Sequence, residues 1–204
     1  MYAKIRNFMR ENREKPIIGF FYRHLKIHEK KRHLKTAGRE IIVDLEGTKE
    51  IYRKDREWLE LVRAYIQGKT LDVGSKYGLV TKDNDVVALD IIKEYLRINV
   101  HANKILADAR NLPFTDESFA TVVATEILEH LEHPDKAVKE IKRVLKNNGR
   151  AIISVPNRYS VFSEVEHIQY FTERRICHLF KDCDVVVCSA ISTGHIFSVI
   201  RVIK

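Results

Sequence analysis

The sequence lacks the features that mark membrane, secreted or zinc-binding chains. No stretch of the 204 residues approaches the 18 or so apolar residues that a membrane span requires, so no transmembrane segment is predicted. The start, MYAKIRNFMRENREK, shows no signal-peptide pattern, and Glu11 and Glu14 argue against a transit peptide. Cysteine is scarce: Cys177, Cys183 and Cys188 form no Cys-x-x-Cys pair. We expect them to be small buried side chains in a reducing cytoplasm.

An excess of either charge is also missing from most of the chain. Residues 41–204 hold 24 Lys or Arg and 24 Asp or Glu, whereas residues 1–40 hold 12 and 4. The whole formal net charge of +8 therefore lies in residues 1–40. Such a basic segment could bind nucleic acid, anionic lipid or an acidic substrate, or it could be a solvated surface.

Short apolar strands alternate with helices from residue 69 onward. Helices are expected around TERRICHLF and in LEHPDKAVKEIKRVLKNNG, the latter stopped by Gly149. This alternation indicates an α/β fold with a mainly parallel, doubly wound sheet. A short Thr193-Gly194 turn makes the last two strands antiparallel. The seven predicted strands are TLDVG, DVVALD, KILADA, FATVVATEI, RAIISVPN, DVVVCSAIS and HIFSVIRVIK.

The region before this core is expected to be a basic, mainly helical extension. REIIVDLEG is interpreted as a short strand or an extended link, and TKEIYRKDREWLELVRAYIQGK as an amphipathic helix that ends at Gly68 and packs on the sheet. We therefore predict an extension over 1–68 that packs on a core domain over 69–204.

Polar residues stand where the predicted strands end, which is where doubly wound sheets bind ligands. The first strand ends in the glycine turn of LDVGSKYG, and the second ends at Asp90, placed to accept hydrogen bonds from both hydroxyls of a ribose. The third ends at Asp108-Ala109, where an acceptor could bind an adenine amino group, and the fourth at Thr125. Any one of these acids could equally cap a helix or form a turn. A dinucleotide-binding dehydrogenase would show a tighter G-x-G-x-x-G and a second nucleotide-binding half.

In order and spacing, LDVGSKYG, VVALDI, DARNLPF, SFATVVATEILEHL and RVLKNNGRAIISVPN resemble the class I S-adenosylmethionine-dependent methyltransferases, most of all the branch with the ubiquinone-biosynthesis O-methyltransferases. The resemblance covers about residues 69–204. It implies a Rossmann-like, seven-stranded sheet with an antiparallel last strand and S-adenosyl-L-methionine as cofactor. Gly74 and its neighbours would contact the methionine part, Asp90 the ribose, and Asp108 with Ala109 the adenine. The expected cofactor-binding residues are Asp72, Gly74, Ser75, Gly78, Asp90, Ile91, Asp108, Ala109 and Thr125.

The sequence departs from the family pattern at three places. Lys76 stands at the middle glycine of the loop, so its side chain must point away from the cofactor or cover it. Gly74 and Asp90 lie only 16 residues apart, so we expect the helix after the loop to shrink to one turn around Gly78–Lys82. Ala120 stands where the family commonly has an acid.

The segment EILEHLEH carries the candidate chemistry on the acceptor side. Glu126, Glu129 and His130 stand at i, i+3 and i+4, which would place them on one face of a helical turn, and His167 could converge on them. Together they could hold a divalent ion that polarises a hydroxyl. Alternatively, His130 or His167 is a general base without metal, or all four are structural. His133, before a proline, is interpreted as structural.

These features favour methyl transfer to an oxygen or nitrogen of a small-molecule or lipid-like acceptor. The acceptor would contact the N-terminal region and the loop VPNRYSVFSEVEHIQYF, whose Tyr159, Phe162, Tyr170 and Phe171 could form an aromatic wall. Two alternatives remain open: an RNA or protein methyltransferase that binds its substrate through residues 1–40, and a non-catalytic, cofactor-binding partner subunit.

Overall fold

The computed structural model describes residues 32–36, 39–43, 56–81, 85–157, 167–191 and 194–204. The chain forms two compact units, Met1–Lys54 and Asp55–Lys204. In the first unit, β1 (Arg32–Thr36) and β2 (Arg39–Val43) form an antiparallel hairpin. The other residues of this unit lie outside the described part, so a mainly helical extension over 1–68 that packs on the core stays a prediction.

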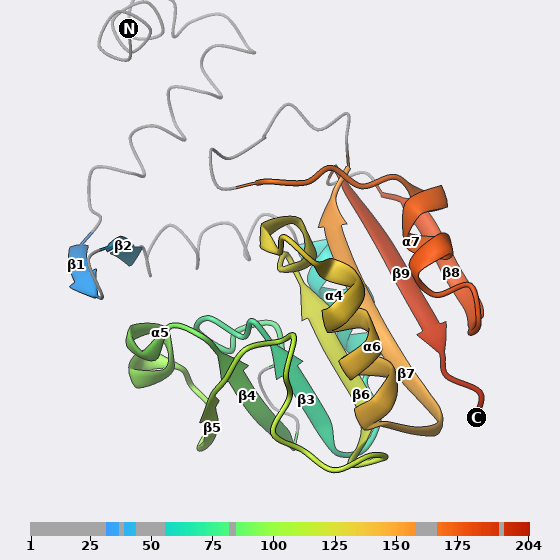
Figure 1. Cartoon of the computed structure of the whole chain (residues 1–204), viewed down its shortest axis with the longest axis horizontal. Coiled ribbons are helices and arrows are strands. Elements are labelled where there is room, and N and C mark those ends of the chain that lie inside the picture. Colours follow the sequence, from blue (N-terminus) through green and yellow to red (C-terminus); the bar gives the residue numbers. More distant parts are fainter. Residues whose placement is uncertain (1–31, 37–38, 44–55, 82–84, 158–166, 192–193) are drawn as a thin grey trace, which may run out of the picture. The chain divides into compact units, whose positions relative to one another are not determined.

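A seven-stranded sheet in the order β5-β4-β3-β6-β7-β9-β8 forms the second unit (Figure 1). The pairs from β5 to β7 are parallel, whereas β9 is antiparallel to both β7 and β8. This arrangement confirms the predicted Rossmann-like sheet with its reversed last strand. The strands are β3 (Thr70–Val73), β4 (Val86–Asp90), β5 (Asn103–Leu106), β6 (Phe119–Thr125), β7 (Leu145–Pro156), β8 (Asp184–Ala190) and β9 (His195–Arg201).

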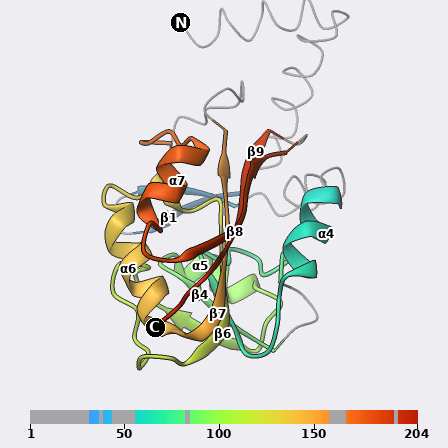
Figure 2. The ribbon, with the colours of Figure 1, turned by 90° about the vertical axis from the view of Figure 1, so that its right-hand side faces the viewer.

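Helices cover both faces of the sheet, which explains why the central strands read as continuous apolar runs. Figure 2 shows α6 (Pro134–Val144) and α7 (Glu173–Leu179) on one side of the strands and α4 (Arg56–Ala64) on the other. A short helix, α5 (Lys93–Ile98), follows β4. Trp58 and Val62 of α4 are buried, as its amphipathic pattern predicts. The residues 48–55 of that predicted helix lie outside the described part.

Two predicted helix ends differ from those observed. Helix α6 stops at Val144 rather than at Gly149, because Leu145 already pairs with Phe119 in the sheet. Among the described residues 74–81 there is no helical turn after the glycine loop. Instead the Gly78 N–H donates to the Ser75 carbonyl at 2.7 Å, and Lys76 and Gly78 both have left-handed φ values of 48° and 72°. These left-handed residues turn the chain where a helix would need right-handed ones.

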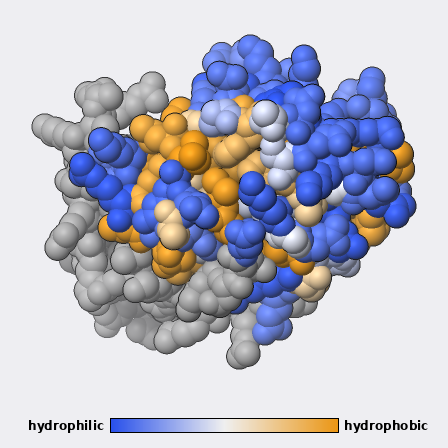
Figure 3. Space-filling model, turned by 90° about the horizontal axis from the view of Figure 1, so that it is seen from below, coloured by the Kyte–Doolittle hydropathy of each residue, from blue (hydrophilic) through white to orange (hydrophobic). Residues whose placement is uncertain are grey.

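The surface of this unit mixes polar and apolar side chains. Figure 3 shows apolar areas between hydrophilic ones on the face seen from below. Ile98, Val100 and Leu106, at the β5 side of the sheet, are exposed. No helix in the described ranges is both long and apolar enough to span a membrane. The three cysteines are free thiols, but each is partly exposed rather than buried.

Candidate functional site

The glycine loop after β3 is anchored to the neighbouring strand. The N–H groups of Gly74 and Ser75 both donate to the Leu89 carbonyl, at 2.8 and 3.0 Å. Gly74 has φ = 70°, and a Cβ there would lie 2.6 Å from Cδ1 of Ile127, in the segment after β6. This position therefore needs glycine for its backbone conformation and for the close approach of the β6 segment.

Lys76 continues the loop in the left-handed conformation that a glycine adopts most easily. Its N–H donates to Oδ2 of Asp90 at 2.9 Å, so the backbone of the loop is tied to the end of β4. The Nζ atom lies over two aromatic rings, 5.5 Å from the centroid of Tyr77 and 5.7 Å from that of Tyr95. The side chain is thus held by a cation–π contact with the Tyr77–Tyr95 pair.

Replacing Lys76 with glycine is expected to leave cofactor affinity within about threefold, because a glycine would still present the backbone N–H that binds Asp90. Relief of the left-handed strain, worth about 1–2 kcal/mol, is offset by the entropy cost of glycine, about 0.5–1 kcal/mol. Urea unfolding would measure the change in stability, and calorimetry would measure the cofactor affinity. Glu117→Gly is the matched control, since Glu117 has φ = 56° but lies outside the loop. Cofactor affinity lost tenfold or more in Lys76→Gly alone would show that the lysine side chain takes part in binding.

A buried polar network lies behind the loop. The Thr81 hydroxyl donates to Oδ2 of Asp72 at 2.6 Å and lies 2.9 Å from Nε2 of His101. The Asn99 amide donates to the Ser75 hydroxyl at 3.0 Å. Burial, together with the nearby charge of Asp90, raises the pKa of Asp72 to about 7 despite the Thr81 hydrogen bond. Asp72 is only 2% exposed and lies inside this network, and its predicted contact with the cofactor stays a prediction.

Gly78 lies against the same network. A Cβ at this position would be 2.6 Å from both Oδ1 of Asn99 and Cδ2 of His101. The second glycine of the loop is therefore required by packing against these side chains, in addition to its φ of 72°. Its predicted contact with the cofactor stays a prediction.

Asp90, at the end of β4, lies between the glycine loop and the end of β5. One carboxylate oxygen accepts the Lys76 N–H and the other accepts the Ile92 N–H, both at 2.9 Å. Burial raises the pKa of Asp90, and the backbone donors with the Lys76 charge partly oppose this. Each oxygen keeps a lone pair for a further donor. The neighbouring Ile91 is 63% exposed and presents an apolar surface beside Asp90.

Asp108 and Ala109 follow β5 at the same edge. The Asp108 carboxylate accepts hydrogen bonds from the backbone N–H of Arg110 at 2.8 Å and from its guanidinium at 2.6 to 3.1 Å. This pairing lowers the pKa of Asp108, so the group stays ionised. Ala109 is buried. An incoming amino group would have to share Asp108 with Arg110, which the sequence did not indicate.

After β6 the chain turns sharply, and the predicted helical face does not form. Thr125 ends the strand, and Glu126 has a left-handed φ of 53°. The carboxylate of Glu126 accepts a hydrogen bond from the Ser154 hydroxyl at 2.7 Å and lies 3.5 Å from Nε2 of His195. Glu126 is therefore turned toward β7 and β9, away from the group in which the sequence placed it.

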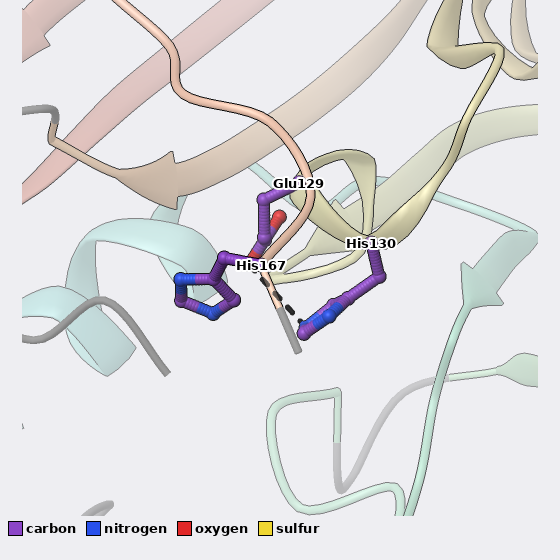
Figure 4. A group of neighbouring side chains, drawn as sticks. All are labelled: Glu129, His130 and His167. Carbon is purple, nitrogen blue, oxygen red and sulfur yellow. Dashed lines mark ion pairs between the residues drawn. The ribbon is translucent and has the colours of Figure 1, made fainter. Parts of the chain in front are cut away.

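The other three members of that group do converge (Figure 4). Glu129 and His130 lie on a 3-10 helix, η2 (Leu128–His130), and His167 lies on the segment before α7. Their ligand atoms lie within 4.8 Å of one another. Oε1 of Glu129 is 3.8 Å from Nε2 of His130, and the two imidazole centroids are 4.9 Å apart. The Glu129 carbonyl accepts the N–H groups of Ile168 and Gln169, which brings His167 to η2.

The predicted aromatic wall is only partly described. Tyr159 and Phe162 lie outside the described residues. Tyr170 is exposed, but Phe171 is fully buried in the core and cannot line a substrate site.

Three side chains at this edge were missed in the sequence: Trp58, Ser154 and His195. Ser154 is in β7, and His195 begins β9, where it pairs with Pro156. Trp58 stacks on the His195 ring with centroids 5.7 Å apart. Because β9 is antiparallel, its first residue lies beside the carboxyl ends of the parallel strands. In the sequence, the dipeptide Thr193-Gly194 was the signal that the last strand reverses, from which the position of His195 at this edge could have been predicted.

Known proteins match the part of the chain that carries the glycine loop, Asp90, Asp108 and Thr125. A family model described as a methyltransferase domain matches residues 71–153. An uncharacterized protein of Methanocaldococcus jannaschii is 37% identical over 112 residues, 53% of this chain and 48% of that protein. The ubiquinone/menaquinone biosynthesis C-methyltransferase UbiE of Burkholderia mallei is 31% identical over 102 residues, 42% of each chain. The chain thus spans about half or less of the length of these relatives.

The fold is shared with solved structures. A SAM-dependent methyltransferase from Aquifex aeolicus has a TM-score of 0.63 at 15% identity, covering 79% of this chain and 100% of that one. The matched residues 71–153 include the glycine loop, Asp90, Asp108 and Thr125. Residues 71–153 therefore belong to the methyltransferase-domain family, and the sheet that contains them has the fold of an S-adenosylmethionine-dependent methyltransferase.

Proposed function

We propose that the protein transfers the methyl group of S-adenosylmethionine to an oxygen or nitrogen of a small-molecule or lipid-like acceptor. The observation that carries this proposal is the edge formed by the glycine loop, Asp90 and Asp108 at three adjacent strand ends. The carbon acceptor implied by the name UbiE belongs to that relative. No Asn/Asp-Pro-Pro-Tyr/Phe motif follows β6, which argues against methylation of amino groups on DNA bases.

The residues at the edge fit this cofactor. Gly74 keeps the loop free of a side chain, Asp90 has lone pairs for two ribose hydroxyls, and the exposed Ile91 offers an apolar surface to the adenine. Asp108 and Ala109 would bind the base, and Thr125 would border the methionine part. The cofactor supplies a methyl group on a sulfonium, so the protein has to position the acceptor and exclude water.

On the acceptor side, we propose that His130 and His167 contact the acceptor as catalytic residues, with Glu129 beside them. One carboxylate and two imidazoles are also a suitable ligand set for a divalent ion, which would polarise an acceptor hydroxyl. Either way, the group holds the acceptor beside the β6 end.

Calorimetry with S-adenosylmethionine and S-adenosylhomocysteine tests the cofactor proposal. We expect both to bind. Absence of binding at millimolar ligand would overturn the proposal, together with the catalytic roles of His130 and His167. Incubation of labelled S-adenosylmethionine with a metabolite extract would then identify the acceptor class.

Metal removal tests the ion separately. If the Glu129–His130–His167 group holds a divalent ion, EDTA is expected to lower label transfer by at least about 100-fold, and the added ion should restore it. Unchanged transfer after EDTA would leave the two histidines as hydrogen-bonding residues. Cofactor affinity, measured in parallel, should not respond to EDTA.

The charge of residues 1–40 favours RNA as a second acceptor class. Binding through phosphates weakens steeply with salt. An RNA affinity that falls strongly between 50 and 200 mM salt, and is lost on removal of residues 1–40, would support this alternative over a small-molecule acceptor.

A further inference from the structure

A second polar group lies at the carboxyl edge, formed by side chains from four elements. Trp58 comes from α4, Glu126 from the end of β6, Ser154 from β7 and His195 from the start of β9. The indole N–H of Trp58 donates to the Ser154 hydroxyl at 3.1 Å, which donates to Oε1 of Glu126 at 2.7 Å. Oε2 of Glu126 lies 3.5 Å from Nε2 of His195, whose ring stacks on Trp58.

The direction of this hydrogen-bond chain is fixed by chemistry. An indole N–H can only donate, so the Ser154 oxygen accepts from Trp58 and its proton must point to Glu126. Ser154 is fully buried and Trp58 is 3% exposed. The buried side chains of Ser154 and Trp58 therefore hold the Glu126 carboxylate in one orientation.

The outer members of the group face solvent. The side chains of Glu126 and His195 are 33% and 19% exposed, in contrast to the buried Trp58 and Ser154. Glu126 reaches this position only through a left-handed φ of 53°, a conformation that costs a glutamate energy and that recurs at functional sites. A partly exposed carboxylate–imidazole pair on a rigid, buried support is the arrangement expected of a group that handles a substrate.

The position of the pair matches the acceptor side of the proposed reaction. Ile127, the residue after Glu126, lies against Gly74 of the glycine loop, so Glu126 is one residue before that contact. Most of the proposed cofactor residues lie at the ends of β3, β4 and β5, and Thr125 lies at the end of β6, which leaves the β7 and β9 side of the edge for the acceptor. We infer that the Glu126–His195 pair takes the proton that leaves the acceptor hydroxyl during methyl transfer.

The step, which rests on the proposed function, balances without a further reagent. The acceptor oxygen forms the new bond to the methyl carbon as the carbon–sulfur bond breaks, and the sulfur keeps the electron pair of that bond. The hydroxyl proton passes to Oε2 of Glu126 and is shared with Nε2 of His195. His130 and His167 retain the role of holding the acceptor. Variants of these two residues and variants of the Glu126–His195 pair are therefore expected to behave differently.

Protonation of His195 can be followed by fluorescence without knowing the acceptor, because Trp58 is the single tryptophan of the chain and stacks on His195. A protonated imidazole quenches a neighbouring indole. The fluorescence of the full-length protein is therefore expected to fall as the pH drops through the range in which an imidazole gains its proton, about pH 6.5. The Trp58 ring and the backbone of Pro156 and Ile191, which also contact His195, carry no titrating group in this range.

Three variants make this test specific. His195→Gln should abolish the fluorescence transition, Glu126→Gln should move its midpoint to lower pH, and His130→Gln should leave it unchanged. Glu126→Gln keeps an oxygen for the Ser154 hydroxyl, so the fold and the support are preserved. A wild-type intensity that does not change between pH 5 and 8, or a transition that survives in His195→Gln, would overturn the proposal.

Label transfer from S-adenosylmethionine into a metabolite extract tests the catalytic step. At saturating cofactor, Glu126→Gln and His195→Gln are each expected to lower the rate by about 100-fold or more, with cofactor affinity within twofold of wild type. Rates within threefold of wild type, in variants that still bind the cofactor, would refute the role of the pair. Failure of the wild-type protein to bind the cofactor would instead refute the proposed function.

Discussion

Asp90→Ala is expected to weaken S-adenosylmethionine binding by at least about 100-fold. In the proposed site, the Asp90 carboxylate accepts both ribose hydroxyls, and each hydrogen bond to a charged group contributes about 1.5–3 kcal/mol. Two such bonds amount to about 3 kcal/mol or more, which is over two orders of magnitude in affinity. The variant also releases the N–H groups of Lys76 and Ile92, so the loop loses one of its ties to β4 and keeps the backbone bonds to Leu89.

Calorimetry of the folded variant would measure the loss. Asp182→Ala is the matched control, because Asp182 is an exposed acid that pairs with Lys142 away from this edge. Circular dichroism should show both variants folded. Near-normal affinity in Asp90→Ala would mean that the ribose is bound elsewhere and that Asp90 serves only to hold the loop.

Asp72→Asn is expected to stabilise the protein at pH 8 and to have little effect at pH 4. The pKa of Asp72 rises from 3.8 to about 7 on folding, because burial disfavours its charged form. Below pH 3.8 the group is mostly protonated in both the folded and the unfolded state. As the pH rises to about 7, ionisation favours the unfolded chain, which removes up to about 4 kcal/mol of stability. Asparagine does not ionise and still offers an oxygen to the Thr81 hydroxyl.

Urea unfolding at pH 4, 5.5 and 8 would measure this difference. Asp182→Asn should show the opposite sign, because Lys142 lowers the pKa of Asp182 and its contribution is lost as the pH falls. A constant difference between Asp72→Asn and wild type across the three values would show that Asp72 does not titrate during unfolding.

The sheet and its strand ends could be predicted because both depend on local sequence. Apolar runs identify β6 and the second half of β7, which are largely buried, while Asp90 ends β4 and Asp108 lies two residues after β5. The positions of Asp90 and Asp108 follow from where the strands end, since parallel strands all end at the same edge of the sheet.

The rest of the site depends on backbone conformations and long-range pairings that have no local signature. The sequence predicts Glu126 and His130, four residues apart, on one face of a helical turn. The left-handed φ of Glu126 instead directs its side chain toward Ser154. Lys76 takes a left-handed conformation although it is a lysine, and Gly78, in the predicted helical turn, is left-handed as well. His195 joins the edge only because β9 inserts between β7 and β8 and runs backward.

That reversed strand has a consequence for how such a protein can change its substrate. The residues proposed to hold the cofactor follow or end the strands β3 to β6. His195 lies at the start of β9, in the β8–β9 hairpin, which joins the sheet only through the pairing of β9 with β7. Substitutions in the two halves fall on different strands and should combine additively. The β8–β9 hairpin can therefore diversify between relatives while the cofactor half stays fixed, so acceptor choice and cofactor choice can evolve as separate traits.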